Sequence, residues 1–282
     1  MVMIEKRVRT KDYLTKSNLP ASDYVINPYV GCPHGCKYCY ARFMKRFTGH
    51  TEPWGEFIDI KECDKPINLQ KIKGKSVFLS SVTDCYNSYE ERYGMTLSIL
   101  KQLVEADAEI TISTKSSLVL RDIELLKRFR NLKVAISINT LHEDFRADMD
   151  KGSSLQERLR ALKELHKAGI YTVLFLSPIF PYITEWKEII ECSRGFVSEY
   201  WFENLNLRGE YKYTILSYID HHYPELMNAY KKIYIQKDRS YWIELADAIS
   251  TYCAAEGIPY INYFYHEQLV REKAEKISKL KR

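Results

Sequence analysis

The chain has 282 residues, a formal net charge of +5, and 45% hydrophobic residues. This length is sufficient for one large α/β domain or two small ones, and no apolar run is long enough to cross a membrane. Residues 1–16 are charged throughout and lack the apolar core of a signal peptide, so we expect a cytoplasmic protein. In that compartment the seven cysteines are expected to be ligands, reactive thiols or buried side chains, and not disulfides.

Short apolar runs alternate with segments of helical spacing along the chain. The expected buried strands are residues 24–30, 75–82, 109–114, 132–139, 171–180, 198–205 and 258–264. Helical spacing is present at 40–47, 95–104, 123–129 and, most clearly, 153–170. At the start of this last helix Ser154 and Glu157 predict a capping box, and Gly169 predicts its end. Its predicted buried face contains Leu155, Leu159, Leu162 and Leu165.

This alternation predicts a parallel sheet of about six βα units, closed or partly closed, in a single domain. A doubly wound sheet with a phosphate loop is the alternative. No G-x-G-x-x-G or G-K-[ST] pattern follows a candidate strand, so we favour the barrel. In a barrel the functional groups lie at the C-terminal ends of the strands, and the search for a site therefore begins there.

The segment NPYVGCPHGCKYCYAR, residues 27–42, follows the first expected strand and contains Cys32, Cys36 and Cys39 in a C-x3-C-x2-C pattern. Thiolates are soft ligands for zinc, copper or iron-sulfur clusters. A closed zinc site requires a fourth ligand, for which His34 and His50 are the local candidates. A cubane cluster held by three thiolates leaves one iron open, so the odd number of thiols favours a cluster that binds a further ligand.

The pattern, with the aromatic Tyr38 directly before the last cysteine, resembles the radical S-adenosylmethionine superfamily. The surrounding NPYxGCxHGCxYCYAR is similar to the branch that contains spore photoproduct lyase. Family-like segments follow in order, namely SSVTDCYNSYE, TKSSLVLRDIELL, AISINT and LSPIFP. The resemblance extends over residues 24–208.

The resemblance implies a partial (β/α)6 TIM-type barrel that holds a 4Fe-4S cluster on Cys32, Cys36 and Cys39. The open iron would take the amine and carboxylate of S-adenosylmethionine. One electron from an external donor of the flavodoxin or ferredoxin type would then cleave this cofactor to methionine and a 5'-deoxyadenosyl radical, which abstracts hydrogen from the substrate. Residues 1–23 would form an N-terminal segment, 24–208 the core barrel, and 209–282 a C-terminal extension of helices and strand that shapes the substrate site.

Cofactor-binding residues follow from the resemblance by position. Lys115 is expected to meet the carboxylate of S-adenosylmethionine, and Tyr38 to pack against the adenine. Ser81 or Thr83 is expected to accept from the methionyl amine. The alternative for Lys115 is an exposed lysine that opens a loop.

Ser137 or Asn139 is expected to bind the ribose hydroxyls, although polar residues at strand ends also serve as caps. Asp84 is expected either in the site or as a residue that orders the loop after the second strand of the barrel. Photoproduct lyases carry a cysteine where this chain has Ser81, so photoproduct lyase activity is not the expectation. Cys85, on the other side of Asp84, is the candidate to return hydrogen to a product radical.

We expect a radical enzyme, of lyase or oxidoreductase type, that acts on a nucleic acid or nucleotide. The branch, the mild basicity and the 22 tyrosines support this substrate class. A peptide or a small metabolite is the alternative substrate, and a non-catalytic metal-binding or interaction module is the alternative of another class. Part of the positive charge lies in residues 271–282, where we expect an exposed terminal helix.

Overall fold

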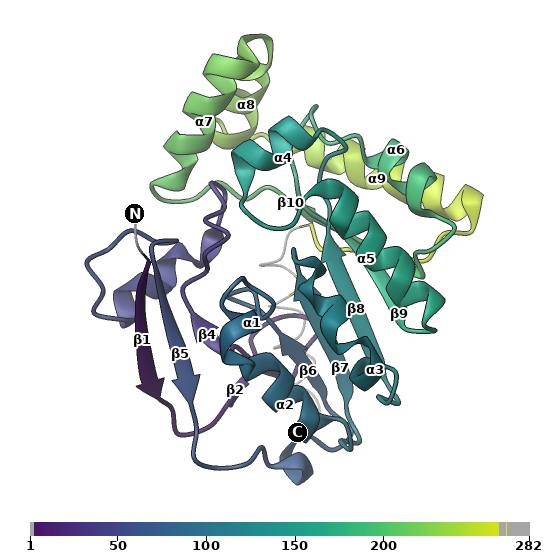
Figure 1. The fold of residues 1–282 in the computed structure, drawn as a ribbon. Helices are drawn as coiled ribbons and strands as arrows, with labels where there is room; N and C mark the ends of the chain where they lie inside the picture. The colour runs from purple at the N-terminus through teal and green to yellow at the C-terminus, as the bar shows by residue number, and fades with distance from the viewer. Residues whose placement is uncertain (1–2, 265–268, 270–282) are drawn as a thin grey trace, which may run out of the picture.

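The computed structural model describes residues 3–264 and 269, and its main element is a mixed sheet that curls into a partial barrel (Figure 1). The strand order is β11-β10-β9-β8-β7-β6-β3-β2. From β3 to β11 every neighbouring pair is parallel and follows chain order, whereas β2 is antiparallel to β3. The edge strands β2 and β11 do not pair with each other, so the barrel is open, as expected. The strands are β2 (Leu14–Lys16), β3 (Tyr24–Ile26), β6 (Ser76–Leu79), β7 (Glu109–Thr114), β8 (Leu132–Ser137), β9 (Tyr171–Ile179), β10 (Glu199–Asn204) and β11 (Tyr260–Asn262).

Helices follow the strands and cover the outer face of the sheet, among them α2, α3 and α5 (Figure 1). The α-helices are α1 (Glu90–Tyr93), α2 (Met95–Leu103), α3 (Ile123–Leu126), α4 (Glu143–Met149), α5 (Leu155–Lys167), α6 (Trp186–Ser193), α7 (Tyr211–His222), α8 (Met227–Tyr234) and α9 (Ser240–Glu256). The 3-10 helices are η1 (Tyr40–Phe47), η2 (Leu69–Ile72), η3 (Ser117–Asp122) and η4 (Pro224–Leu226). Within the described residues, no helix has the length and apolar character that a bilayer span requires.

The barrel strands separate two apolar layers because their side chains alternate between the faces of the sheet. In β8, Val134 and Ile136 belong to the main core, which lies under the helices. Ala135, between them, packs with Val173 and Trp201 in a second cluster on the other face. This second layer fills the interior of the barrel below the strand ends.

Helix α5 begins with the expected capping box, in which Ser154 and Glu157 bond each other's backbone N–H groups. Its buried face differs from the expected one. Leu155 and Leu159 are only half-buried, and the buried stripe is Arg158, Ala161, Leu162 and Leu165. The face is rotated because a charged residue, Arg158, is fully buried in an ion pair described below.

A second, three-stranded sheet was not expected from the sequence and stands beside the barrel (Figure 1). It contains β1 (Ile4–Arg9), β5 (Phe57–Glu62) and β4 (Tyr29–Val30). The expected strand 24–30 is therefore wrong as one element, because its two ends join different sheets. The chain turns at Asn27, whose side chain bonds Ser81 Oγ at 2.9 Å and the N–H of Val82 at 3.0 Å, and Pro28 follows without a backbone donor.

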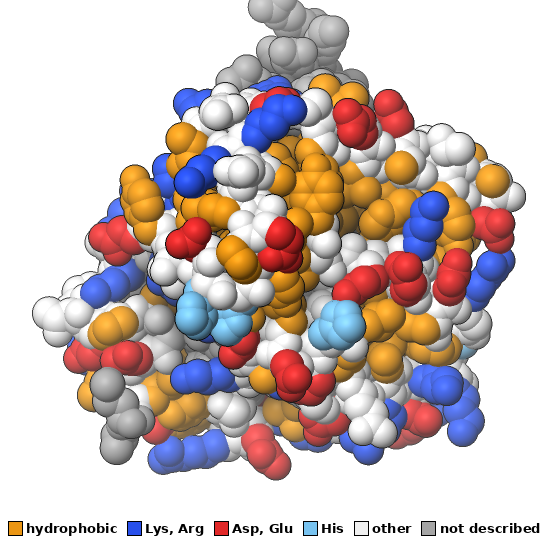
Figure 2. Space-filling model, turned by 90° about the horizontal axis from the view of Figure 1, so that it is seen from above, with side chains coloured by type: hydrophobic (Ala, Val, Ile, Leu, Met, Phe, Trp, Pro, Cys, Tyr) orange, Lys and Arg blue, Asp and Glu red, His pale blue; other side chains and the backbone are white. Residues whose placement is uncertain are grey.

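The C-terminal extension contains α7, η4, α8, α9 and β11. In Figure 1, α7 and α8 form a pair above the barrel. Seen from above, the upper face carries acidic, basic and apolar side chains interspersed, with histidines at two places (Figure 2). The predicted terminal helix at 271–282 lies outside the described residues.

Candidate functional site

The three cysteines lie on the loop that connects β4 to η1. Gly31 precedes this loop with φ +86°, and a Cβ there would lie 2.3 Å from the carbonyl oxygen of Phe57, so only glycine fits. Two turns space the cysteines, with bonds from Gly35 N–H to the Cys32 carbonyl at 3.3 Å and from Cys39 N–H to the Cys36 carbonyl at 3.2 Å. All three are free thiols, of which Cys32 is buried and the other two half-buried.

The surroundings of the loop keep these thiols protonated until a metal binds. Burial raises the pKa of Cys32 well above its usual range, and the negative charge of Asp84 adds to this effect. Burial likewise raises the pKa of Cys36, with Asp150 as the next contribution. Because the thiolate is the form that binds metals, loading must displace these protons.

The donor set fits an iron-sulfur cluster better than a closed zinc site. Both expected zinc histidines are engaged elsewhere: His34 Nε2 bonds Asp84 at 3.0 Å, and His50 lies between Glu52 and Asp59 at 2.9 Å each. In the described part of the chain, no three His, Cys, Asp or Glu side chains surround a common point for one ion. A cubane cluster makes a different demand, since each cysteine binds a separate iron.

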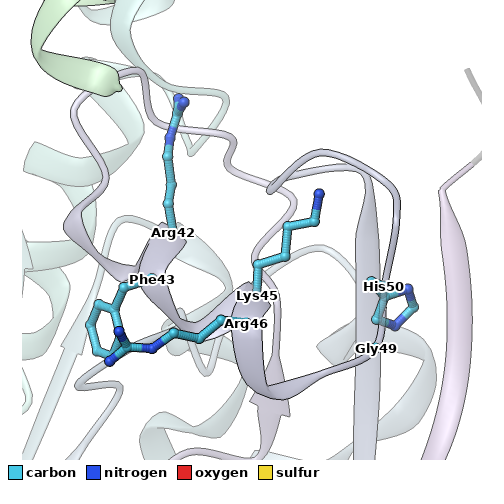
Figure 3. Close-up of a pocket in the computed structure, with 6 residues that line it drawn as sticks. All are labelled: Arg42, Phe43, Lys45, Arg46, Gly49 and His50. Carbon is cyan, nitrogen blue, oxygen red and sulfur yellow. The ribbon is translucent and has the colours of Figure 1, made fainter. Parts of the chain in front are cut away.

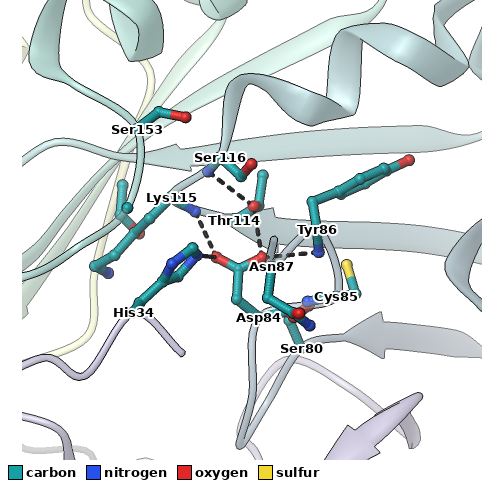
Figure 4. A network of polar contacts seen from close by, with 12 residues as sticks. His34, Ser80, Asp84, Cys85, Tyr86, Asn87, Thr114, Lys115, Ser116 and Ser153 are labelled. Atoms are coloured by element: carbon teal, nitrogen blue, oxygen red, sulfur yellow. Dashed lines mark hydrogen bonds and ion pairs between the residues drawn. The ribbon is translucent and has the colours of Figure 1, made fainter. Parts of the chain in front are cut away.

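Asp84 connects the cysteine loop to the ends of β6 and β7 (Figure 4). One carboxylate oxygen accepts from His34 and, at 2.7 Å, from the N–H of Lys115. The other accepts from Thr114 Oγ1 at 2.6 Å and from the N–H of Tyr86 at 2.9 Å. Burial opposes ionisation, but His34 and these hydrogen bonds outweigh it and lower the pKa of Asp84 to about 2. Asp84 therefore joins the cysteine loop to the ends of two strands, and the choice between its two expected roles stays a prediction.

A second buried network holds Tyr38. Its hydroxyl donates to Asp150 Oδ2 at 3.2 Å, and its ring meets Phe180 edge-on at 5.6 Å. Asp150 pairs with Arg158, which also donates to the carbonyl of Ser137 at 3.1 Å. Burial raises the pKa of Asp150, but Arg158 outweighs it and the net pKa is lowered. Tyr38, next to the last cysteine, is thereby tied to the end of β8.

Lys115 lies directly after β7, at the strand end where the sequence analysis expects it. Its Nζ is 5.8 Å from the centre of the Tyr38 ring. Its backbone is fixed by Asp84 on one side and by the N–H of Ser153, which donates to the Lys115 carbonyl at 3.0 Å, on the other. Among the described residues, Lys115 forms no ion pair within 4.0 Å, so its ammonium is available to a ligand.

The other expected residues make contacts that support the same region. Thr83 Oγ1 donates to the Gly31 carbonyl at 2.7 Å, which joins the β6 loop to the start of the cysteine loop. Asn139 Nδ2 donates to the Pro178 carbonyl at 3.3 Å. Cys85 is fully buried in the main core, and burial raises the pKa of its thiol well above the usual range. Cys85 therefore presents no accessible surface, and its role as hydrogen donor stays a prediction.

Sequence reasoning missed a carboxylate at the mouth of the barrel, Glu203 at the end of β10. Ser177 Oγ donates to it, and the part of the chain that the structure describes contains no ion pair to it. Tyr40, half of which is exposed, is close by: its hydroxyl donates to the Ser81 carbonyl, and the charge of Glu203 acts on it. The sequence signal that could have located Glu203 is its spacing, since Glu199, Trp201 and Glu203 occupy alternate positions of one strand and therefore share one face of the sheet.

A groove of about 520 Å³ lies beside η1 (Figure 3). It is lined by Arg42, Phe43, Lys45, Arg46, Gly49 and His50. Phe43 is 44% and Phe47 67% exposed, and the Arg46 guanidinium lies 5.5 Å and 4.7 Å from their ring centres. Arg42 donates to the Cys36 carbonyl at 3.3 Å, so the groove begins at the cysteine loop.

Residues 26–192 match the Radical SAM superfamily. The chain belongs to this superfamily. Its members use a 4Fe-4S cluster and S-adenosylmethionine, and they require an external reductant. An uncharacterized protein of Methanocaldococcus jannaschii is 38% identical over 221 residues, which are 78% of this chain and 83% of that protein.

Solved structures of two other proteins share the fold. A spore photoproduct lyase variant with bound AdoMet and dinucleoside spore photoproduct has a TM-score of 0.57 at 16% identity, and the similarity covers 78% of this chain and 66% of that one. Streptococcus suis SuiB bound to its precursor peptide SuiA has a TM-score of 0.54 at 16% identity, over 84% and 48% of the chains. At this identity the comparison establishes the partial barrel fold, and the chain spans just under two thirds of the lyase.

Proposed function

We propose that this protein is a radical SAM enzyme in which Cys32, Cys36 and Cys39 hold a 4Fe-4S cluster. The cysteine loop carries this proposal, since it presents three free thiols and leaves both nearby histidines bound to carboxylates. The bound cluster supplies the electron that cleaves S-adenosylmethionine to a 5'-deoxyadenosyl radical for hydrogen abstraction. The protein's own residues orient the cofactor and keep the site dry.

For S-adenosylmethionine, we assign the carboxylate to Lys115 and the adenine to Tyr38. The ammonium and the ring lie 5.8 Å apart, and no carboxylate among the described residues neutralises Lys115 within ion-pair distance. We assign the methionyl amine to Ser81 or Thr83. The ribose is assigned to Ser137 or Asn139 at the end of β8.

For the substrate we propose a nucleic acid or nucleotide. The groove beside η1 supports this class, because Arg42, Lys45 and Arg46 can meet phosphates while Phe43 can stack on a base. Glu203 at the barrel mouth can accept hydrogen bonds from the N–H groups of a base. The structural neighbour bound to a dinucleoside agrees with this class.

The alternative substrate is a peptide or small metabolite, which the likeness to peptide-bound SuiB favours. A lyase or oxidoreductase reaction fits either substrate. The alternative of another class is a non-catalytic metal-binding or interaction module.

Anaerobic reconstitution with iron and sulfide tests the proposed activity. We expect a brown protein that forms 5'-deoxyadenosine from S-adenosylmethionine when dithionite is added. The variant C36A is expected to lose this product, whereas C192A, which removes an exposed cysteine on α6, is expected to retain it. A colourless zinc protein without deoxyadenosine would support the non-catalytic module instead.

Salt-dependent binding to single-stranded DNA or RNA tests the substrate class. Each phosphate contact releases counterions, so replacing Lys45 and Arg46 by alanine is expected to weaken binding and reduce the slope against log salt by about 1–2. The matched control replaces Arg160 and Lys163, which line a separate surface on α5. Absence of wild-type binding at low salt would favour the peptide or small metabolite.

A further inference from the structure

Among the residues that the structure describes, the indole N–H of Trp54 has no hydrogen-bond partner, although its nitrogen is buried. The Trp54 side chain lies in the loop between η1 and β5, and the residue is only 9% exposed. Buried N–H groups without partners are rare in folded proteins, and each one requires an explanation such as a ligand that arrives later.

The position of Trp54 is fixed against the cysteine loop. Its ring meets Phe57 edge-on at 5.7 Å, and both pack with Cys32 in one small apolar cluster that Cys39 also contacts. The backbone is equally close, since a Cβ on Gly55 would lie 3.1 Å from the Cα of Gly35 in the cysteine loop. The indole therefore cannot swing away from the cysteines without displacing this packing.

Cys39 packs against the cluster that contains Trp54 and Cys32, and it is the cysteine on which the Trp54 side chain acts. The contact does not meet the geometry of a hydrogen bond, and a neutral thiol is only a weak acceptor. A thiolate is a much stronger acceptor, because hydrogen bonds to charged groups are shorter and about twice as strong as neutral ones.

We propose that Trp54 donates a hydrogen bond to the Cys39 thiolate once this sulfur binds iron, and that this bond raises the reduction potential of the cluster. The inference rests on the proposed function. Reduction adds one electron from the external donor to the cluster, and a donor aimed at a ligand sulfur stabilises the added negative charge. Trp54 is thus a residue that sets how easily the cluster accepts its electron.

The test compares W54F with W201F in the reconstituted holoenzyme. W54F keeps an aromatic ring and removes the N–H. W201F removes a second buried indole N–H that has no partner within the described part of the chain, on strand β10 of the barrel. Potentiometric titration followed by EPR is expected to give a more negative midpoint for W54F. A tenfold drop in the equilibrium constant for reduction corresponds to about 59 mV for one electron. W201F is expected to keep the wild-type potential.

Pulsed EPR adds a readout that packing alone does not change. In H2O the wild type and W201F are expected to show an exchangeable proton coupled to the reduced cluster, which disappears in W54F. A loaded W54F with unchanged potential and unchanged proton coupling would overturn the inference and leave the proposed function standing. A wild type that binds no cluster would overturn both.

A second measurement does not depend on the folding of W54F. Wild-type protein labelled with 5-fluorotryptophan has a stronger N–H donor at each of its four tryptophans. We expect its cluster to have a less negative potential, and labelled W201F to show the same shift. An unshifted potential in both labelled proteins would contradict the proposed hydrogen bond.

Discussion

Replacing Asp84 by asparagine removes the carboxylate that joins the cysteine loop to the strand ends, and its effect can be worked out from the pKa. In the folded protein the pKa of Asp84 is about 2, against an ordinary value of 3.8. One pKa unit corresponds to about 1.4 kcal/mol, so ionisation of Asp84 contributes about 2 kcal/mol to the free energy of unfolding at pH 7. D84N is expected to lose this contribution.

The pH dependence of this loss has a definite sign. Because the folded pKa is lowered, the contribution is complete above the unfolded pKa near 4 and is lost as the pH falls through about 2. Urea unfolding of the metal-free proteins is therefore expected to show a gap between wild type and D84N of about 2 kcal/mol at pH 7, and about half of that at pH 3.

The matched control is D64N, because Asp64 is exposed and pairs with the exposed Arg9 at 3.3 Å. Exposed pairs contribute about 0–1 kcal/mol, so this variant is expected to unfold close to the wild type. A D84N protein that is as stable as D64N at pH 7, or a gap that stays constant down to pH 3, would refute the assigned role of Asp84.

Three further variants test the site. G31A places a methyl group against the Phe57 carbonyl at a φ of +86°, so we expect a loss of about 1–3 kcal/mol in urea unfolding, and wild-type stability would contradict the close approach. R158M leaves the buried Asp150 with the more distant Arg146, at 3.8 Å, as its ion-pair partner, so a drop of about 3–5 kcal/mol is expected. The double variant D150N/R158M is expected to recover part of this loss, and equal stability of both variants would argue against the Asp150–Arg158 pair. K115Q is expected to weaken S-adenosylmethionine binding about tenfold, equivalent to about 1.4 kcal/mol, as measured by calorimetry. The control K133Q, on strand β8, is expected to leave the affinity unchanged. Equal affinities of the two variants would contradict a role of Lys115 in cofactor binding.

The barrel strands were predictable because the sequence signal for each is local. The run at 109–114 coincides with β7, and the run at 171–180 differs from β9 by one residue. The capping box of Ser154 and Glu157 is also a local signal, and it was confirmed. The resemblance added the family and the open barrel, which agree with the sequence match and the structural neighbours.

The small sheet was not predictable in the same way, because its strands are held by partners far along the chain. Residues 4–9 pair with residues 57–62, and the β4 strand is too short to carry a periodic signal. The rotated face of α5 has a similar cause. Arg158 looks like a surface residue until Asp150, eight residues earlier, is known to lie beside it.

The sequence predicts candidate ligands for the site, but not the residues that pack against them. Cys32, Cys36, Cys39 and Lys115 follow from a motif and from strand ends. Trp54 reaches the cysteine loop only through tertiary packing, and no local pattern distinguishes it from another buried aromatic residue.

Hydrogen bonds along the loop that carries the cysteines order its backbone, which lowers the conformational entropy of the loop before any metal binds. The Gly31 and His34 carbonyls accept from Thr83 and from the N–H of Lys151, and the N–H of Lys37 donates to the Met149 carbonyl at 2.9 Å. Ordering a residue costs about 1–2 kcal/mol. Here that ordering occurs during folding of the barrel, so it does not reduce metal affinity, and amides of the loop should resist hydrogen exchange before any iron is bound.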